Sequence, residues 1–132
     1  MVDLLLYSLP IKSSIRNYEV FFSKSIFESF EAELKPDDVI FVDRKVFGYL
    51  NKNVQQLITA NKHIFIDATE KQKSYTALTP IIGELIESGF RKNNRLIAIG
   101  GGITQDITAF IASMMYRGVT WLFFPTTLLA QA

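Results

Sequence analysis

The sequence contains no cysteine and only one histidine among its 132 residues. The lack of cysteine excludes disulfides and thiolate metal sites and favours a reducing, cytoplasmic setting. His63 has no second histidine with which to share a metal ion. No apolar stretch approaches about 18 uninterrupted residues, so we expect no membrane span. The start of the chain carries Asp3 where a signal peptide needs basic residues.

The sequence also lacks a marked excess of charge of either sign. The 14 basic and 13 acidic residues leave a net charge of +1 with no long run of either sign. A broad electrostatic footprint for nucleic acid is therefore not expected. Hydrophobic residues make up 48% of the chain, and eleven residues are phenylalanine. This composition favours one domain over residues 1–132, with a dense core or with apolar surface kept for a partner.

Apolar patterning predicts strands that alternate with helices. A hairpin-like pair of strands is expected over residues 4–7 and 18–22, followed by a helix over 25–34. Further strands are expected over 39–42, 64–66, 96–99 and 119–124, and helices over 46–60, 74–90 and 103–116. The alternation predicts an α/β fold, a Rossmann-like parallel sheet flanked by helices.

The strongest local motif is the glycine turn Gly100–Gly102, which follows an apolar strand and precedes a helix. Glycine lets a ligand approach the backbone closely, and the following helix presents unpaired N–H groups and the positive end of its dipole. These features together predict a phosphate site at the carboxyl edge of the sheet. Asp106 is expected in the first helical turn, either as a helix-stabilising residue or as an acceptor for a ligand. A simple tight turn remains the alternative interpretation.

Three blocks of sequence resemble the core signature of the 3-dehydroquinate synthases. They are Leu96–Asp106 with its glycine turn, Tyr116–Gly118, and Pro125–Gln131, and the intervals between them match as well. The segment Glu70–Lys73 is similar to the family's glutamate-x-x-lysine segment. The resemblance is specific over residues 95–131 and looser before them.

The resemblance implies NAD as cofactor and assigns residues to it. Gly101, Gly102, Ile103 and Asp106 would line its pyrophosphate and beyond, and Asp43 would accept hydrogen bonds from the adenosine ribose. Glu70 and Lys73 would lie along the adenosine half, Thr126 and Thr127 would also contact the cofactor, and Arg117 would face a sugar-phosphate substrate.

The residues alone leave other interpretations open. Asp43 is equally suited to cap a helix, and Glu70 with Lys73 forms an ordinary exposed pair three residues apart. Thr126 and Thr127 follow Pro125 as turn formers would. Arg117 precedes Gly118 as a residue near a helix C-terminus would.

The implied reaction is that of an NAD- and metal-dependent carbon-oxygen lyase of the shikimate pathway, acting on a small sugar phosphate. The family's metal, zinc or cobalt, is held by a glutamate and two histidines in a later helical domain. We expect the chain to stop at Ala132 before that domain, to be inactive alone, and to belong to a homodimer when complete.

Two positions depart from the family pattern. Gln105 and Ala109 stand where the family often has glycine, and the interval from Asp43 to Glu70 is shorter than usual. Three alternatives therefore stay open: a cyclase of another sugar phosphate, an iron-dependent alcohol or glycerol dehydrogenase, and a non-catalytic nucleotide-binding fragment. The dehydrogenases usually have serine and proline after the glycines, unlike this chain.

Overall fold

The structure is a computed structural model that describes residues 5–12, 18–23 and 25–126. The chain divides into two compact units, residues 1–34 and 35–132. Among the described residues, no helix has the length and apolar character needed to cross a bilayer.

The first unit holds a hairpin and one helix. Strand β1 (Leu5–Ile11) pairs antiparallel with β2 (Tyr18–Ser23), with Leu9 opposite Val20. Helix α1 (Ile26–Glu33) follows, and the Ser25 hydroxyl caps it by accepting a hydrogen bond from the Glu28 N–H at 3.3 Å. The hairpin and the helix expected here from the sequence are confirmed.

The second unit is built on a four-stranded parallel sheet with the strand order β4-β3-β5-β6. The strands are β3 (Val39–Asp43), β4 (His63–Ile66), β5 (Leu96–Gly100) and β6 (Trp121–Pro125). Leu96 of β5 lies opposite Val39 of β3 and Trp121 of β6. The predicted α/β class and parallel sheet are confirmed.

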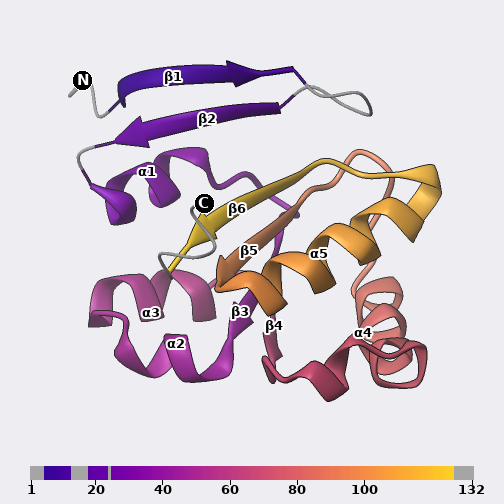
Figure 1. The fold of residues 1–132 in the computed structure, drawn as a ribbon. Coiled ribbons are helices and arrows are strands. Elements are labelled where there is room, and N and C mark those ends of the chain that lie inside the picture. The colour runs from indigo at the N-terminus through magenta and orange to yellow at the C-terminus, as the bar shows by residue number, and fades with distance from the viewer. Residues whose placement is uncertain (1–4, 13–17, 24, 127–132) are drawn as a thin grey trace. The chain divides into compact units, whose positions relative to one another are not determined.

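Helices flank this sheet on both faces (Figure 1). Helices α2 (Arg44–Tyr49) and α3 (Lys52–Thr59) connect β3 to β4 on one side. On the other side lie the 3₁₀ turn η1 (Glu70–Lys73), α4 (Tyr75–Glu87) and α5 (Gly102–Met114). A second 3₁₀ turn, η2 (Met115–Arg117), leads from α5 towards β6.

Alternate strand residues point to opposite faces, and both faces are buried over β3 and β5. Phe41 and Leu96 belong to a core cluster that includes Leu85 of α4 and Ile111 of α5. The other face carries Ile40 and Ile97, both 0% exposed, and α3 contributes the buried Val54 and Ile58. Continuous apolar runs such as Val39–Val42 therefore reflect a sheet covered on both sides.

The single helix expected over residues 46–60 is wrong. Asp43 caps a helix that starts at once, and the chain leaves helical geometry at Leu50, where ψ is 151°. Asn51 then begins α3 by accepting a hydrogen bond from the Val54 N–H at 3.0 Å. Two strong capping side chains eight residues apart favour two short helices over one long one.

At the amino edge of the sheet, a buried ion pair joins β3 to β5. The Arg95 side chain contacts both Asp38 carboxylate oxygens, at 3.1 and 2.8 Å, and the Lys35 N–H donates to the same carboxylate. The side chain of Asp38 is 2% exposed and that of Arg95 12%. Breaking such a pair leaves an uncompensated buried charge, which is costly.

We expect Asp38→Asn to lower the free energy of unfolding by about 3 to 5 kcal/mol, because it removes the buried carboxylate charge that faces the Arg95 guanidinium. Asp37→Asn is the matched control: Asp37 pairs with Lys62 at 3.0 Å, but both side chains are largely exposed. The control should lower the free energy of unfolding by less than about 1 kcal/mol. Urea denaturation of both variants checks this, and equal losses would contradict it.

Candidate nucleotide site at the carboxyl edge of the sheet

The direction of the chain connections reverses between β3 and β5. The chain leaves β3 towards β4 through α2 and α3, and it leaves β5 towards β6 through α5 on the opposite face. The two neighbouring strands therefore send their connections apart at their carboxyl ends. This switch point is where ligands bind in open α/β sheets.

Gly100 ends β5 at this switch point and has no room for a side chain. A Cβ built there would lie 2.7 Å from the Thr104 hydroxyl oxygen and 3.1 Å from the Asp43 Cβ. Its carbonyl accepts a hydrogen bond from the Thr126 N–H at 2.8 Å. Gly100 thus brings the ends of β3, β5 and β6 together with the start of α5.

The N-terminus of α5 has no side-chain cap. Each of the other described α-helices has one, from Ser25, Asp43, Asn51 and Ser74. The capping position of α5 is Gly101, which has no side chain, and the first helical bond runs from the Gln105 N–H to the Gly101 carbonyl at 3.0 Å. The amides of residues 102–104 therefore precede the helical ladder, as in an anion site.

Gly102, unlike Gly100, has open space beside it. A Cβ built on Gly102 would meet nothing within 4 Å, and the residue is exposed. Gly101 and Ile103 are half-buried on either side of it. A ligand could approach the backbone at Gly102 without displacing any described group.

Asp43 lies at the end of β3, where it caps α2. One of its carboxylate oxygens, Oδ1, accepts hydrogen bonds from the Lys45 N–H at 2.8 Å and the Val46 N–H at 3.3 Å. The capping interpretation is therefore confirmed. No hydrogen bond within the described residues uses Oδ2, so a ligand role remains compatible with the cap.

The structure corrects the expected position of Asp106. Because α5 begins at Gly102, Asp106 is its fifth residue and lies beyond the first turn. Its Oδ2 instead accepts a hydrogen bond from the Lys73 ammonium at 2.7 Å, and Lys73 also lies 3.7 Å from Glu70. The hydrogen bond to Asp106 raises the pKa of Lys73, against a smaller opposing effect of desolvation.

A pocket of about 290 Å³ lies beside this ion pair. Its lining is Lys73, Tyr75, Leu78, Asp106, Ile107 and Phe110. The Tyr75 and Phe110 rings meet edge to face, with centroids 5.6 Å apart. No local pattern predicts this pocket, because its walls come from segments about thirty residues apart.

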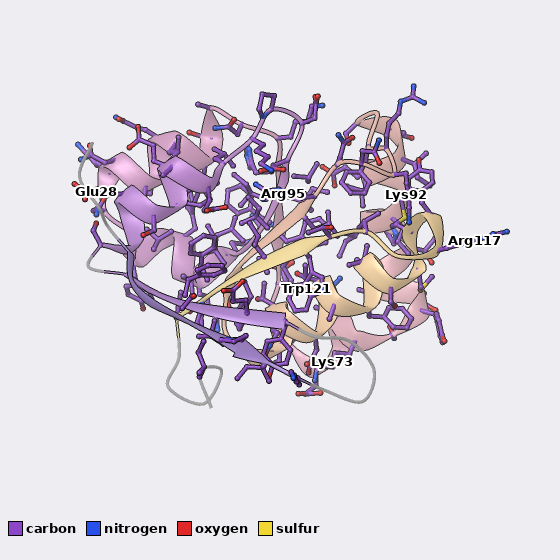
Figure 2. The ribbon with its side chains drawn as sticks, turned by 90° about the horizontal axis from the view of Figure 1, so that it is seen from above. Glu28, Lys73, Lys92, Arg95, Arg117 and Trp121 are labelled. Carbon is purple, nitrogen blue, oxygen red and sulfur yellow. The ribbon has the colours of Figure 1, made fainter. Side chains whose placement is uncertain are left out.

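Arg117 lies far from the glycine turn. It belongs to η2, after the 13 residues of α5, which span about 20 Å at 1.5 Å per residue. Figure 2 shows Arg117 at the periphery, pointing outward and well separated from Lys73. The carbonyls of this turn, at Tyr116 and Gly118, accept hydrogen bonds from Lys92. Within one chain, Arg117 does not join the other predicted site residues.

The structure describes one of the two threonines that were predicted as site residues. Thr126 is exposed and lies directly after β6, beside Gly100. Thr127 lies outside the described residues. Arg44, next to Asp43, pairs with Asp67 at 2.9 Å and lies 5.1 Å from the centroid of the Phe65 ring, and the pairing with Asp67 was not expected from the sequence. The signal was Asp67 itself, an acidic residue directly after a buried strand.

No metal site is formed by the described part of the chain. No group of three or more histidine, cysteine, aspartate or glutamate side chains there could hold a metal ion. The polar groups described at this edge are backbone amides, hydroxyls, and the ion pairs made by Lys73 and Arg44.

Two solved structures of synthases share the fold of this chain. A 2-deoxy-scyllo-inosose synthase complexed with carbaglucose-6-phosphate, NAD⁺ and Co²⁺ matches with a TM-score of 0.76 at 22% identity, over 94% of this chain and 36% of that one. A 2-epi-5-epi-valiolone synthase from Streptomyces hygroscopicus with NAD⁺ and Zn²⁺ bound matches with a TM-score of 0.63 at 20% identity, over 79% of this chain and 31% of that one. This chain shares the fold of the matching part of these two synthases.

Sequence relatives narrow this class. The family model described as 3-dehydroquinate synthase N-terminal matches residues 63–132, just over half of the chain. The 3-dehydroquinate synthases of Staphylococcus carnosus and Campylobacter concisus are 33% and 34% identical, over 87% and 94% of this chain. The chain belongs to the 3-dehydroquinate synthase family. It spans 34% and 35% of these two relatives, about a third of their length.

Thr104 places a buried hydroxyl beneath the glycine turn. Thr104 is 0% exposed, and its hydroxyl has no hydrogen-bond partner among the described residues. Thr104→Val keeps the shape of the side chain and removes the unpaired group, so we expect it to raise the free energy of unfolding by about 1 kcal/mol.

Thr108→Val is the matched control in the same helix. The Thr108 hydroxyl is also buried, but it donates to the Thr104 carbonyl at 2.8 Å. This variant should lower the free energy of unfolding by about 0.5 to 1 kcal/mol. Denaturant titrations of both variants measure the difference, and a destabilised Thr104→Val variant would show that its hydroxyl has a partner.

Proposed function

We propose that the glycine turn and the N-terminus of α5 bind the diphosphate of NAD. The observation that carries the proposal is an uncapped helix N-terminus with open space at Gly102, located at the switch point of a parallel sheet. Backbone amides and the helix dipole there suit an anion without any cationic side chain.

The surrounding residues fit the rest of such a cofactor. The amides of Gly102 and Ile103 would donate hydrogen bonds to the diphosphate, and Gly101, which has no side chain, would lie beside it. Asp43, at the neighbouring strand end, offers a carboxylate oxygen to a ribose hydroxyl, as acidic residues do in dinucleotide folds. Thr126, directly after β6, would supply a hydroxyl or backbone contact, and we carry over the same role for Thr127 from the family resemblance alone. Glu70, Lys73 and Asp106 would contact the cofactor from the η1 side. When bound, NAD supplies a reversible hydride acceptor.

We further propose that the whole protein is a 3-dehydroquinate synthase. It would convert 3-deoxy-arabino-heptulosonate 7-phosphate to 3-dehydroquinate and phosphate, with residues 1–132 as its NAD-binding domain. The names of the sequence relatives support this substrate, and the described residues contribute binding and orientation of the cofactor. In this proposal the divalent metal binds in another part of the whole protein, and residues 1–132 alone should lack turnover.

A second candidate is a cyclase acting on another sugar phosphate. Two observations favour this candidate. The half-buried Gln105 of α5 stands where the family often has glycine, and the structural neighbours include inosose and valiolone synthases. Phosphate release by the full-length protein from candidate sugar phosphates, with heptulosonate 7-phosphate among them, separates the two.

Arg117 fits a substrate role only under a further condition. Its place at the far end of α5 means that a substrate beside the glycine turn of the same chain is out of its reach. A contact with the sugar phosphate would therefore need a second copy of the chain, which agrees with the proposed homodimer.

An NMR titration tests the diphosphate site directly. We expect NAD⁺ and ADP to shift the amide signals of Gly101, Gly102 and Ile103, and adenosine to leave them unchanged, because only the first two carry a diphosphate. The amide of Gly89, which ends α4, serves as an internal reference that should not move. Unchanged signals at 101–103 with saturating NAD⁺ would sink the proposal.

Gly102→Ala places a methyl group where the cofactor should lie. We expect at least about tenfold weaker NAD⁺ binding with no loss of stability, because the methyl group meets no described atom and alanine is the better helix former. Gly83→Ala in α4 is the matched control, since a Cβ there also meets nothing within 4 Å. Both variants should raise the free energy of unfolding by up to about 1 kcal/mol, and only Gly102→Ala should weaken NAD⁺ binding.

A further inference from the structure

The turn that carries Arg117 holds side chains in a conformation that favours glycine. Three successive residues, Tyr116, Arg117 and Gly118, have φ angles of 49°, 65° and 108°. Such left-handed values are costly for a residue with a Cβ, and only Gly118 avoids that cost. Strain of this kind persists where the surrounding structure imposes it, and it often accompanies function. An arginine at this position therefore directs attention to its side chain and to whatever holds it there.

The side chain of Arg117 does not hold the turn together. It is exposed, and it makes no hydrogen bond or ion pair with any described residue. Figure 2 shows it pointing outward. Its neighbours are anchored instead: Met115 and Val119 are buried, and the Val119 N–H donates to the Ala112 carbonyl of α5 at 2.9 Å. The fold thus fixes the chain on both sides of Arg117 and leaves the guanidinium free to meet another molecule.

The segment before β5 holds this turn in place. The Lys92 ammonium donates hydrogen bonds to the Tyr116 carbonyl, at 2.9 Å, and to the Gly118 carbonyl. These two carbonyls flank Arg117. The Tyr116 hydroxyl donates to the Phe90 carbonyl at 2.8 Å, and the two aromatic rings have centroids 6.5 Å apart. The segment at residues 90–92 therefore contacts the turn through a side chain in each direction.

Lys92 does more here than a cation does at an ordinary helix C-terminus. Such a cation stabilises the helix mainly through its charge, and its exact placement matters little. Lys92 instead bridges the carbonyls before and after one residue, so a change of backbone conformation at Arg117 would break at least one of the two hydrogen bonds. The left-handed conformation of Arg117 therefore depends on Lys92.

We propose that Lys92 is a positioning residue for the sugar phosphate, because it holds residues 115–118 in the form that presents Arg117 to a substrate bound in a second copy of the chain. This inference rests on the substrate role proposed for Arg117. A guanidinium binds a phosphate through a planar fork of N–H groups, so its contribution depends on where the backbone places it. Lys92 acts on the substrate through that placement.

A double-mutant cycle on the full-length protein tests this role, with the KM for 3-deoxy-arabino-heptulosonate 7-phosphate as the readout. We expect Lys92→Met to raise this KM about fivefold, because the released turn misplaces the guanidinium. In the Arg117→Ala background the same change should have less than about a twofold effect, since no guanidinium remains to be placed. Lys92→Arg, which keeps donors for the two carbonyls, should restore most of the affinity.

Two controls separate placement from general effects. Arg91→Met removes a positive charge from the neighbouring exposed position, and its KM for the sugar phosphate should stay within about twofold of that of the unchanged protein. The KM for NAD⁺ should also stay within about twofold in Lys92→Met, because the glycine turn lies at the opposite end of α5. A variant that was merely misfolded would lose both affinities.

The strain in the turn has its own test. Arg117→Gly and Arg117→Ala both remove the guanidinium, but only glycine adopts a left-handed φ without steric cost. We expect the glycine variant of the full-length protein to unfold about 2 °C above the alanine variant in thermal melts. Equal melting temperatures would show that Arg117 is not held in this conformation, and the inference would fail.

The remaining outcomes are also distinct. If Arg117→Ala raises the KM for the sugar phosphate but Lys92→Met does not, or raises it equally in both backgrounds, Lys92 is not a positioning residue, while the role of Arg117 stands. If Arg117→Ala leaves that KM unchanged, or the full-length protein releases no phosphate from this substrate, the corresponding part of the proposed function fails and the inference falls with it.

Discussion

The parallel pairing of β3 with β5 is the contact on which the rest of this structure depends. Its register is tied at one end by the buried pair of Asp38 and Arg95 and at the other by the close approach of Asp43 to Gly100. These two strands carry connections that leave on opposite faces, so their carboxyl ends are left without a covering helix. The topology of the sheet, more than any single residue, therefore determines where the candidate site lies.

Much of this architecture could be predicted from local sequence. Apolar runs such as Val39–Val42 mark buried strands, and the glycines after Ile99 mark a turn that starts a helix, because both features depend on neighbouring residues only. The division between α2 and α3 was missed because two capping side chains outweighed an otherwise continuous helical pattern. The Lys73–Asp106 pair could not be derived, since nothing in either segment indicates that the fold brings them together.

The resemblance to a family and the geometry contribute different knowledge. The family names residues along the whole motif, from Asp43 to Thr127, without saying which of them can act together. The structure gathers Asp43, the glycine turn, Asp106 and Thr126 at one edge and places Arg117 at the other end of α5. Residues that share a motif thus divide between two ends of a helix, a distinction that a linear pattern does not contain.

The crowding at Gly100 also limits how this turn can change over evolutionary time. A new methyl group there would lie 2.9 Å from the Thr104 Cβ as well as 2.7 Å from its hydroxyl. Shortening Thr104 to alanine would therefore not make room, and even glycine at that place, which weakens a helix, would leave the Asp43 Cβ 3.1 Å away. A lineage would have to cross a less stable intermediate to alter Gly100, so this position should stay glycine for as long as Asp43 and Thr104 keep their places beside it.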